Sequence, residues 1–250
     1  MEYFFMFEFI QNLLKRLQPI LVQSMEPHGM AILEHVKTNR EQFYKHFVFN
    51  TNTTTVLSSS MYLYPLLAEK LTNVVLDNCK GKVLDVGAGG GFITLKLQDK
   101  GYKVTAIDIS AHCVEAMKLL GVKDCLVSDI FDITEQFDTI LLLGSTLGCI
   151  GAIDLFPVLL SKLDEILKPD GQIIIEESDF HNFWFSYEWE GYFKYKNYIG
   201  QEFSWFNIPA NELIELAYSY GWHVEIIDTF DINQFDNPSY LASMTKIRRQ

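Results

Sequence analysis

Four glycines stand within five residues, from Gly87 to Gly91, and this stretch constrains the fold more than any other. An apolar run of β type, residues 83–86, precedes the glycines, and apolar residues at helical spacing follow in residues 92–97. Such a strand–turn–helix unit directs backbone N–H groups and a helix N-terminus to one point, and the missing Cβ atoms let a ligand approach the main chain. We therefore expect a nucleotide-like ligand at the start of a doubly wound α/β sheet.

Strands and helices alternate from Lys82 onwards. The expected strands are residues 82–86, 103–108, 124–128, 137–143 and 172–177, and the expected helices are about 91–99, 111–119 and 151–167. A further helix over 209–220 and two closing strands, 222–228 and 240–247, complete the chain. This alternation predicts a parallel sheet with helices on both faces.

Residues 1–78 have a different pattern and are predicted to form an N-terminal helical cap or lid on the domain formed by 79–250. Apolar residues recur at three- and four-residue spacing up to Leu21, and a second helix is expected from about Gly29 to Phe47. The small polar residues of 50–60 predict a loop or linker, and 61–78 again predicts a helix. These helices could cover the active site, form a dimer face or pack on the core.

The segment 180–206 is unusually aromatic, because 13 of its 27 residues are Phe, Trp or Tyr. Residues 192–198 and 202–206 alternate around 199–201, which predicts a β-hairpin inserted into the domain. Large aromatic side chains could form a substrate pocket, a dimer interface or plain core.

Composition narrows the possible partners. The net charge of −12 weighs against nucleic acid, since phosphate neutralisation needs a face rich in Lys and Arg. The four cysteines have no CxxC spacing, so no metal site is expected and reduced thiols in the cytoplasm are favoured. No apolar stretch reaches the ~20 residues of a membrane span, and no secretory signal is evident.

The glycines belong to the pattern Asp85-x-Gly87-x-Gly89-x-Gly91, which resembles the first motif of class I S-adenosylmethionine-dependent methyltransferases. A dinucleotide site of the NAD type would need a glycine where Phe92 stands, so this alternative is disfavoured. Asp108 ends the second strand, 21 residues after Gly87, and Ser128-Asp129-Ile130 ends the third. Residues 137–144 and 168–172 are similar to the family's fourth motif and to its LxPGG turn, with Asp170 in place of the first glycine.

The resemblance implies a mostly parallel seven-stranded sheet with an antiparallel last strand, and S-adenosyl-L-methionine as cofactor. It also implies cofactor-binding roles for Asp85, Gly87, Gly89, Gly91, Asp108, Ile109, Asp129, Ile130 and Gly144. Asp108 would accept hydrogen bonds from the ribose hydroxyls, and Asp129 would meet the adenine amino group.

The acceptor is expected to be a small molecule methylated at O or N. The fourth motif lacks the Asn/Asp-Pro-Pro-Tyr signature of base and glutamine methylation, and no Pro-Cys nucleophile is present. His181, whose ordinary pKa lies near neutrality, or Asp179 is the candidate general base. The candidate acceptor-binding residues are Trp184, Tyr187 and Tyr192. A homodimer is possible, and a non-catalytic cofactor-binding subunit or an NAD-type oxidoreductase are the alternative functions.

Overall fold

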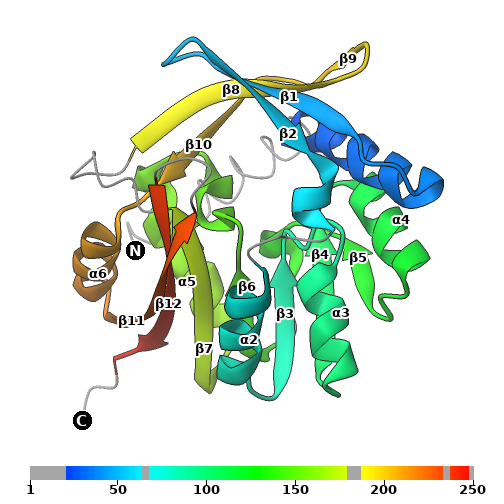
Figure 1. Cartoon of the computed structure of the whole chain (residues 1–250). Coiled ribbons are helices and arrows are strands. Elements are labelled where there is room, and N and C mark those ends of the chain that lie inside the picture. Colours follow the sequence, from blue (N-terminus) through cyan, green and yellow to red (C-terminus); the bar gives the residue numbers. More distant parts are fainter. Residues whose placement is uncertain (1–20, 64–67, 179–186, 233–236, 248–250) are drawn as a thin grey trace.

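The computed structural model describes residues 21–63, 68–178, 187–232 and 237–247, which form two β-sheets with helices (Figure 1). The larger sheet has seven strands in the order β11-β12-β7-β6-β3-β4-β5. The strands are β3 (Lys82–Val86), β4 (Lys103–Asp108), β5 (Cys125–Val127), β6 (Phe137–Leu142), β7 (Leu167–Ser178), β11 (Trp222–Ile232) and β12 (Asn237–Lys246). The strands β3 to β7 pair in parallel, and β12 runs antiparallel to β7 and β11, so the predicted fold class is confirmed.

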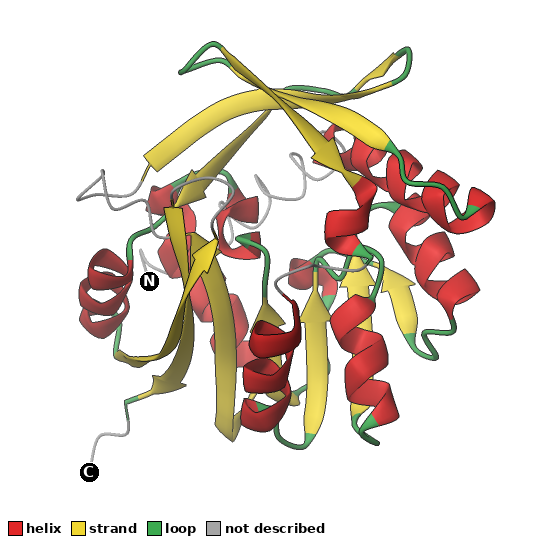
Figure 2. Ribbon diagram, viewed as in Figure 1, coloured by secondary structure: helices red, strands yellow, loops and turns green. Residues whose placement is uncertain are grey.

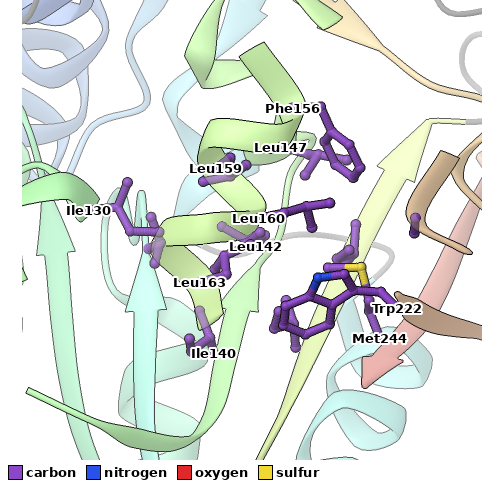
Figure 3. Close-up of a cluster of buried hydrophobic side chains, with 14 of the residues drawn as sticks. Ile130, Ile140, Leu142, Leu147, Phe156, Leu159, Leu160, Leu163, Trp222 and Met244 are labelled. Carbon is purple, nitrogen blue, oxygen red and sulfur yellow. The ribbon is translucent and has the colours of Figure 1, made fainter. Parts of the chain in front are cut away.

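Apolar side chains of the central strands point alternately to the two faces of this sheet, and both faces are buried. Val83, Leu141 and Ile174 pack toward α2 (Ala68–Asn78) and α3 (Phe92–Asp99). Their neighbours Leu84, Leu142 and Ile173 belong to the opposite cluster, with α5 (Phe156–Ile166) and α6 (Ala210–Ser219), and Figure 3 shows part of that cluster. Because successive side chains of a strand point to opposite faces, these apolar runs need helices on both sides. Another helix of this part of the chain is α4 (Ala111–Leu120).

A second, antiparallel sheet lies across the carboxyl ends of the parallel strands (Figures 1 and 2). Its order is β10-β8-β1-β2, and the short β9 pairs with β8. The strands are β1 (Phe43–Val48), β2 (Thr53–Ser58), β8 (Tyr187–Tyr195), β9 (Tyr198–Ile199) and β10 (Phe203–Asn207). The pairing of β1 with β8 joins the N-terminal region to the aromatic segment, so both contribute to one structure above the parallel sheet.

Two predictions for the N-terminal region are wrong. The expected helix over 29–47 covers 21–38 of the described residues and ends before Asn39, which has φ of 51°, and Phe43–Val48 is a strand. The expected loop over 50–60 contains the strand Thr53–Ser58, because β1 supplies hydrogen-bonding partners along its whole length. The region expected to be helical from 61 begins with a 3-10 helix, η1 (Ser59–Tyr62), and α2 begins at Ala68.

The hairpin predicted in the aromatic segment is confirmed in its strands and wrong in its turn. β8 pairs with β10 in antiparallel register, from Phe203 opposite Gly191 onwards. The tight turn contains Lys196, with φ of 53°, and Tyr198–Ile199 folds back on β8 as β9. A Cβ on Gly191 would lie 2.0 Å from the Phe47 carbonyl oxygen, so glycine is needed where β8 meets β1. Among the described helices, none is long and apolar enough to cross a membrane.

Candidate active site

The glycine turn between β3 and α3 is held against the neighbouring strand β4. Gly87, Gly89 and Gly91 have φ of 67°, 56° and 77°, which side chains rarely adopt. The backbone N–H groups of Gly87 and Ala88 donate to the Ile107 carbonyl over 2.9 and 3.1 Å. The turn therefore sits at the carboxyl edge of the sheet, where α/β sheets bind their ligands.

A cavity of about 1140 Å³ lies between this edge and the second sheet. Ligand pockets usually have volumes of ~300–1,000 Å³, so this one has room for a nucleoside cofactor and a second small molecule. Seven of the predicted cofactor residues line it: Gly87, Gly89, Asp108, Ile109, Asp129, Ile130 and Gly144. They lie at or directly after the ends of β3, β4, β5 and β6, so these four strand ends meet at one cavity.

Asp85 and Gly91, predicted to contact the cofactor, do not belong to the described lining of the cavity. Asp85 is 4% exposed and accepts a hydrogen bond from the Thr94 hydroxyl over 2.5 Å, which ties β3 to the first turn of α3. Burial raises the pKa of Asp85 to about 6. A Cβ on Gly91 would lie within 2.9 Å of Val122 and Met117 atoms, so this glycine packs the turn against α4. Both residues shape the turn from behind.

Asp108 presents a carboxylate whose position is fixed by the backbone. It is 8% exposed and accepts hydrogen bonds of 2.9 Å from the N–H groups of Gly89 and Ser110. Burial raises its pKa to about 6, against the opposing effect of the two backbone donors, so the group is mainly ionised at pH 7. An anchored carboxylate at the end of the second parallel strand suits a pair of vicinal hydroxyls, as in a ribose.

Asp129 and the turn after β6 form the neighbouring parts of the cavity. Asp129 accepts a hydrogen bond from the Phe131 N–H over 3.0 Å and caps η2 (Ile130–Asp132), and burial raises its pKa. Gly144, with φ of 65°, has open space where a Cβ would stand and donates its N–H to Glu176 over 2.6 Å. These features fit a nucleoside with an amino-acid tail, because a wall without side chains stands beside hydrogen-bonding groups.

The inner face of the second sheet forms one wall of the cavity, which we call the roof. The sheet contributes His46, Trp189, Phe193, Phe203 and Trp205 to the roof, and the helix 21–38 contributes His28. The Trp205 indole N–H donates to the Ser145 carbonyl over 3.1 Å and so fastens the roof to the turn after β6. A Cβ on Gly148, in η3 (Thr146–Ile150), would lie 2.1 Å from the Phe206 carbonyl oxygen. Glycine is required where this attachment is closest.

Two roof histidines were missed by the sequence analysis. His28 Nδ1 lies 2.7 Å from the Tyr44 hydroxyl, and the His28 ring meets Tyr62 edge-on at 4.5 Å. The His46 ring lies 4.7 Å from the Trp189 ring, and its buried Nε2 has no hydrogen-bond partner. Burial lowers the pKa of both histidines to about 4, so they are neutral at pH 7. The signal that could have found His46 is its alternation with Tyr44 and Val48 in an apolar strand.

A buried carboxyl supports the roof from below. Glu177, fully buried near the end of β7, accepts a 2.6 Å hydrogen bond from the Asn207 amide, and the Asn207 oxygen accepts one of 3.1 Å from the Trp189 indole. Burial raises the pKa of Glu177 to about 8. This chain of hydrogen bonds fixes the orientation of the Trp189 ring.

The structure places only some of the predicted acceptor residues. Tyr187 lines the cavity. Tyr192 does not, because it lies on the outer face of β8 and stacks on Phe47 with ring centroids 4.6 Å apart, which corrects its predicted role. Asp179, His181 and Trp184 lie outside the described residues, and their roles stay predictions.

The strand order, the glycine turn and the acidic ends of β4 and β5 define a class I methyltransferase architecture. A family model described as a methyltransferase domain matches residues 5–227, and the chain belongs to this family. No match was found among curated proteins.

Solved structures agree with this assignment. A methyltransferase from Bacteroides fragilis, in complex with S-adenosyl-L-homocysteine, is 30% identical over 91% of this chain and 97% of that one, with a TM-score of 0.78. Two others show the fold alone. Burkholderia thailandensis 1,6-didemethyltoxoflavin-N1-methyltransferase is 16% identical over 75% of this chain and 81% of that one, with a TM-score of 0.56. DhpI is 15% identical over 92% and 98%, with a TM-score of 0.58.

The protein is therefore an S-adenosylmethionine-dependent methyltransferase, and S-adenosylmethionine is its cofactor.

Proposed function

We propose that this enzyme methylates a small molecule at oxygen or nitrogen, inside the cavity between its two sheets. The observation that supports this proposal most directly is that the cavity has a polar end and an aromatic end. Asp108 and Asp129 stand at the carboxyl ends of the strands, and aromatic rings of the roof stand on the other side. One end thus suits the cofactor, and the other suits an acceptor of similar size.

The residues at the cofactor end hold and orient, because the bound sulfonium supplies an already activated methyl group. Asp108 accepts from the ribose hydroxyls, with its carboxylate kept in place by Gly89 and Ser110. Asp129, next to the apolar Ile130, meets the adenine. Gly87 and Gly144 leave the main chain open to the amino-acid tail. Fixed groups of this kind lower the entropic cost of aligning the two reactants.

At the acceptor end, the roof excludes water and orients the nucleophile. During transfer, the acceptor O or N forms the new bond to carbon, and sulfur keeps the electron pair of the bond that breaks. An acceptor that carries a proton releases it to water or to a base. His181 or Asp179 remains the proposed base, and the neutral His28 and His46 offer hydrogen-bond acceptors inside the cavity.

Calorimetry with S-adenosylmethionine, S-adenosylhomocysteine and NAD tests the cofactor end. The first two are expected to bind and NAD is not, and binding of NAD alone would overturn the proposal. Turnover is tested by methyl release from labelled S-adenosylmethionine in the presence of a cell extract fractionated by mass. Label in a macromolecular fraction alone would contradict a small-molecule acceptor, and cofactor binding without any label would favour the non-catalytic subunit.

The proposal also includes the setting of the enzyme. The four cysteines are free, and three of them are buried, which supports the reducing cytoplasm. The net charge of −12 supports the absence of a nucleic-acid partner. A homodimer stays possible, and sedimentation of the purified chain would test it.

A further inference from the structure

The acceptor end of the cavity carries a charge pattern that restricts what can enter it. Among the described residues that line the cavity, none is a lysine or an arginine. The charged residues of the described lining are acidic instead, among them Asp108 and Asp129 at the strand ends and Glu202 just before β10. A cleft lined by one sign of charge concentrates ligands of the opposite sign and opposes ligands of its own sign. An anionic acceptor would meet no matching cation in the part of the cavity that the structure describes.

The tryptophans of the roof offer ring faces rather than polar groups. The Trp189 indole N–H is used by Asn207, and the Trp205 indole N–H is used by Ser145. Both rings line the cavity, and their centroids lie 6.2 Å apart at an interplanar angle of 25°. Such faces bind flat rings by stacking and cations by attraction to the ring quadrupole.

His46 adds one unsatisfied hydrogen-bonding atom among these rings. Its Nε2 is buried without a partner, and the residue lines the cavity beside Trp189 and Phe193. Because a buried polar atom without a partner is costly, a ligand that moves in beside the ring and supplies a donor gains what the free protein lacks. The ring is neutral at neutral pH, because burial lowers its pKa to about 4, and a neutral ring can accept a hydrogen bond from an N–H or O–H group.

We propose that the acceptor is a flat, aromatic or heteroaromatic molecule that is uncharged or cationic, and that it donates an N–H or O–H to His46. This inference rests on the proposed function, because it assigns the acceptor end of the same cavity. It excludes carboxylate- and phosphate-bearing acceptors, which would meet acidic residues and no lysine or arginine in the described lining.

Three indoles that differ only in side-chain charge test the charge rule: tryptamine (cationic), tryptophol (uncharged) and indole-3-propionate (anionic). Each is titrated by calorimetry into the protein saturated with S-adenosylhomocysteine, at low and at high salt. Tryptamine and tryptophol are expected to bind at least tenfold more tightly than indole-3-propionate, and the advantage of tryptamine over tryptophol should shrink at high salt. Equal or tighter binding of indole-3-propionate, or binding by none of the three, would overturn the inference.

Variants test the hydrogen bond and the ring wall. His46→Phe and Trp189→Leu should each weaken tryptophol binding about tenfold, while affinity for S-adenosylhomocysteine stays unchanged. Phe47→Leu is the matched control, because Phe47 neighbours His46 on the opposite face of β1 and stacks on Tyr192 outside the cavity. Unchanged tryptophol affinity in His46→Phe would refute the assigned hydrogen bond.

The two proposals fail in distinguishable ways. If S-adenosylhomocysteine does not bind the wild-type protein, the cofactor assignment in this cavity fails, and the order of the three indoles is still read in its absence. If S-adenosylhomocysteine binds and the order of the indoles is reversed or absent, the proposed methyl transfer stands and the acceptor class is wrong.

Discussion

The buried carboxyl of Glu177 should make the free energy of unfolding depend on pH, and replacing Glu177 by glutamine should remove this dependence. The carboxyl is fully buried next to Glu176, and burial raises its pKa from 4.5 to about 8. Its Oε1 accepts from the Asn207 amide and from the Ser178 N–H, and the Ser145 side chain is a further hydrogen-bonding partner of the carboxyl. Glutamine keeps an acceptor oxygen for both donors and cannot ionise.

The direction and the size of this change in the free energy of unfolding follow from proton linkage. Between pH 4.5 and about 8, the native state holds a proton on Glu177 that the unfolded chain has lost, so the free energy of unfolding falls as pH rises. A pKa near 8 makes the contribution of this one group ~2 kcal/mol smaller at pH 8 than at pH 6. Other titrating groups act equally in both proteins and cancel in the difference between wild type and variant.

Urea unfolding followed by tryptophan fluorescence at pH 6, 7 and 8 measures this difference directly. The stability of Glu177→Gln relative to wild type should rise by ~2 kcal/mol over that range. Glu225→Gln, at an exposed position on β11, is the matched control and should show no such trend. If the wild-type and Glu177→Gln curves stay parallel from pH 6 to 8, Glu177 is ionised throughout and the reasoning is refuted.

Three further substitutions separate binding, packing and surface charge. Asp108→Asn should weaken S-adenosylhomocysteine binding about 10–100-fold, since hydrogen bonds to a charged group contribute ~1.5–3 kcal/mol. The wild-type protein should lose affinity as pH falls through about 6, where Asp108 takes up a proton, and the variant should not. Calorimetry at pH 5.5 and 7.5 measures both effects. Gly148→Ala should lower the free energy of unfolding by ~1–3 kcal/mol, because its Cβ would overlap the Phe206 carbonyl, and an unchanged urea midpoint would contradict this. Lys196→Ala should leave the urea midpoint unchanged, because its ion pair with Glu34 is solvent-exposed, and a clear fall of the midpoint would show that the pair stabilises the fold.

The parallel sheet could be predicted because its signals are local. Each central strand is an apolar run followed by a helix, and the end of each strand carries its own side chain for the site, such as Asp108 or Asp129. The glycine pattern was read correctly as a turn, yet it did not distinguish glycines that face a ligand from Gly91, which packs on Met117 and Val122. That distinction depends on the contact between α4 and the turn, and the residues of the turn alone do not indicate this contact.

The second sheet could not be predicted because its strands find their partners far away in the chain. β1 pairs with β8 across 143–149 residues, from Val48 opposite Gly191 to Lys45 opposite Lys194, so no turn signal links them. β2 is an edge strand with mostly exposed threonines, and its order comes from hydrogen bonds to β1 rather than from burial. Its composition is therefore that of a loop. Because β1 was missed, His46 was missed as a cavity residue.

Tyr62 connects the cofactor end of the cavity with its acceptor end. A Cβ on Gly90 would lie 2.8 Å from the Tyr62 carbonyl oxygen, so η1 packs directly on the glycine turn. The Tyr62 hydroxyl is hydrogen-bonded to Tyr44 of β1, and its ring meets His28 of the roof.

Tyr62→Ala should therefore weaken binding of S-adenosylhomocysteine and of tryptophol together, whereas Trp189→Leu should weaken only tryptophol binding. Calorimetry with each ligand on both variants separates the two outcomes. A Tyr62→Ala protein that folds like wild type and loses affinity for tryptophol alone would show that the turn and the roof are independent. Loss of both affinities in Tyr62→Ala, with only one lost in Trp189→Leu, places the mechanical link between cofactor and acceptor at η1.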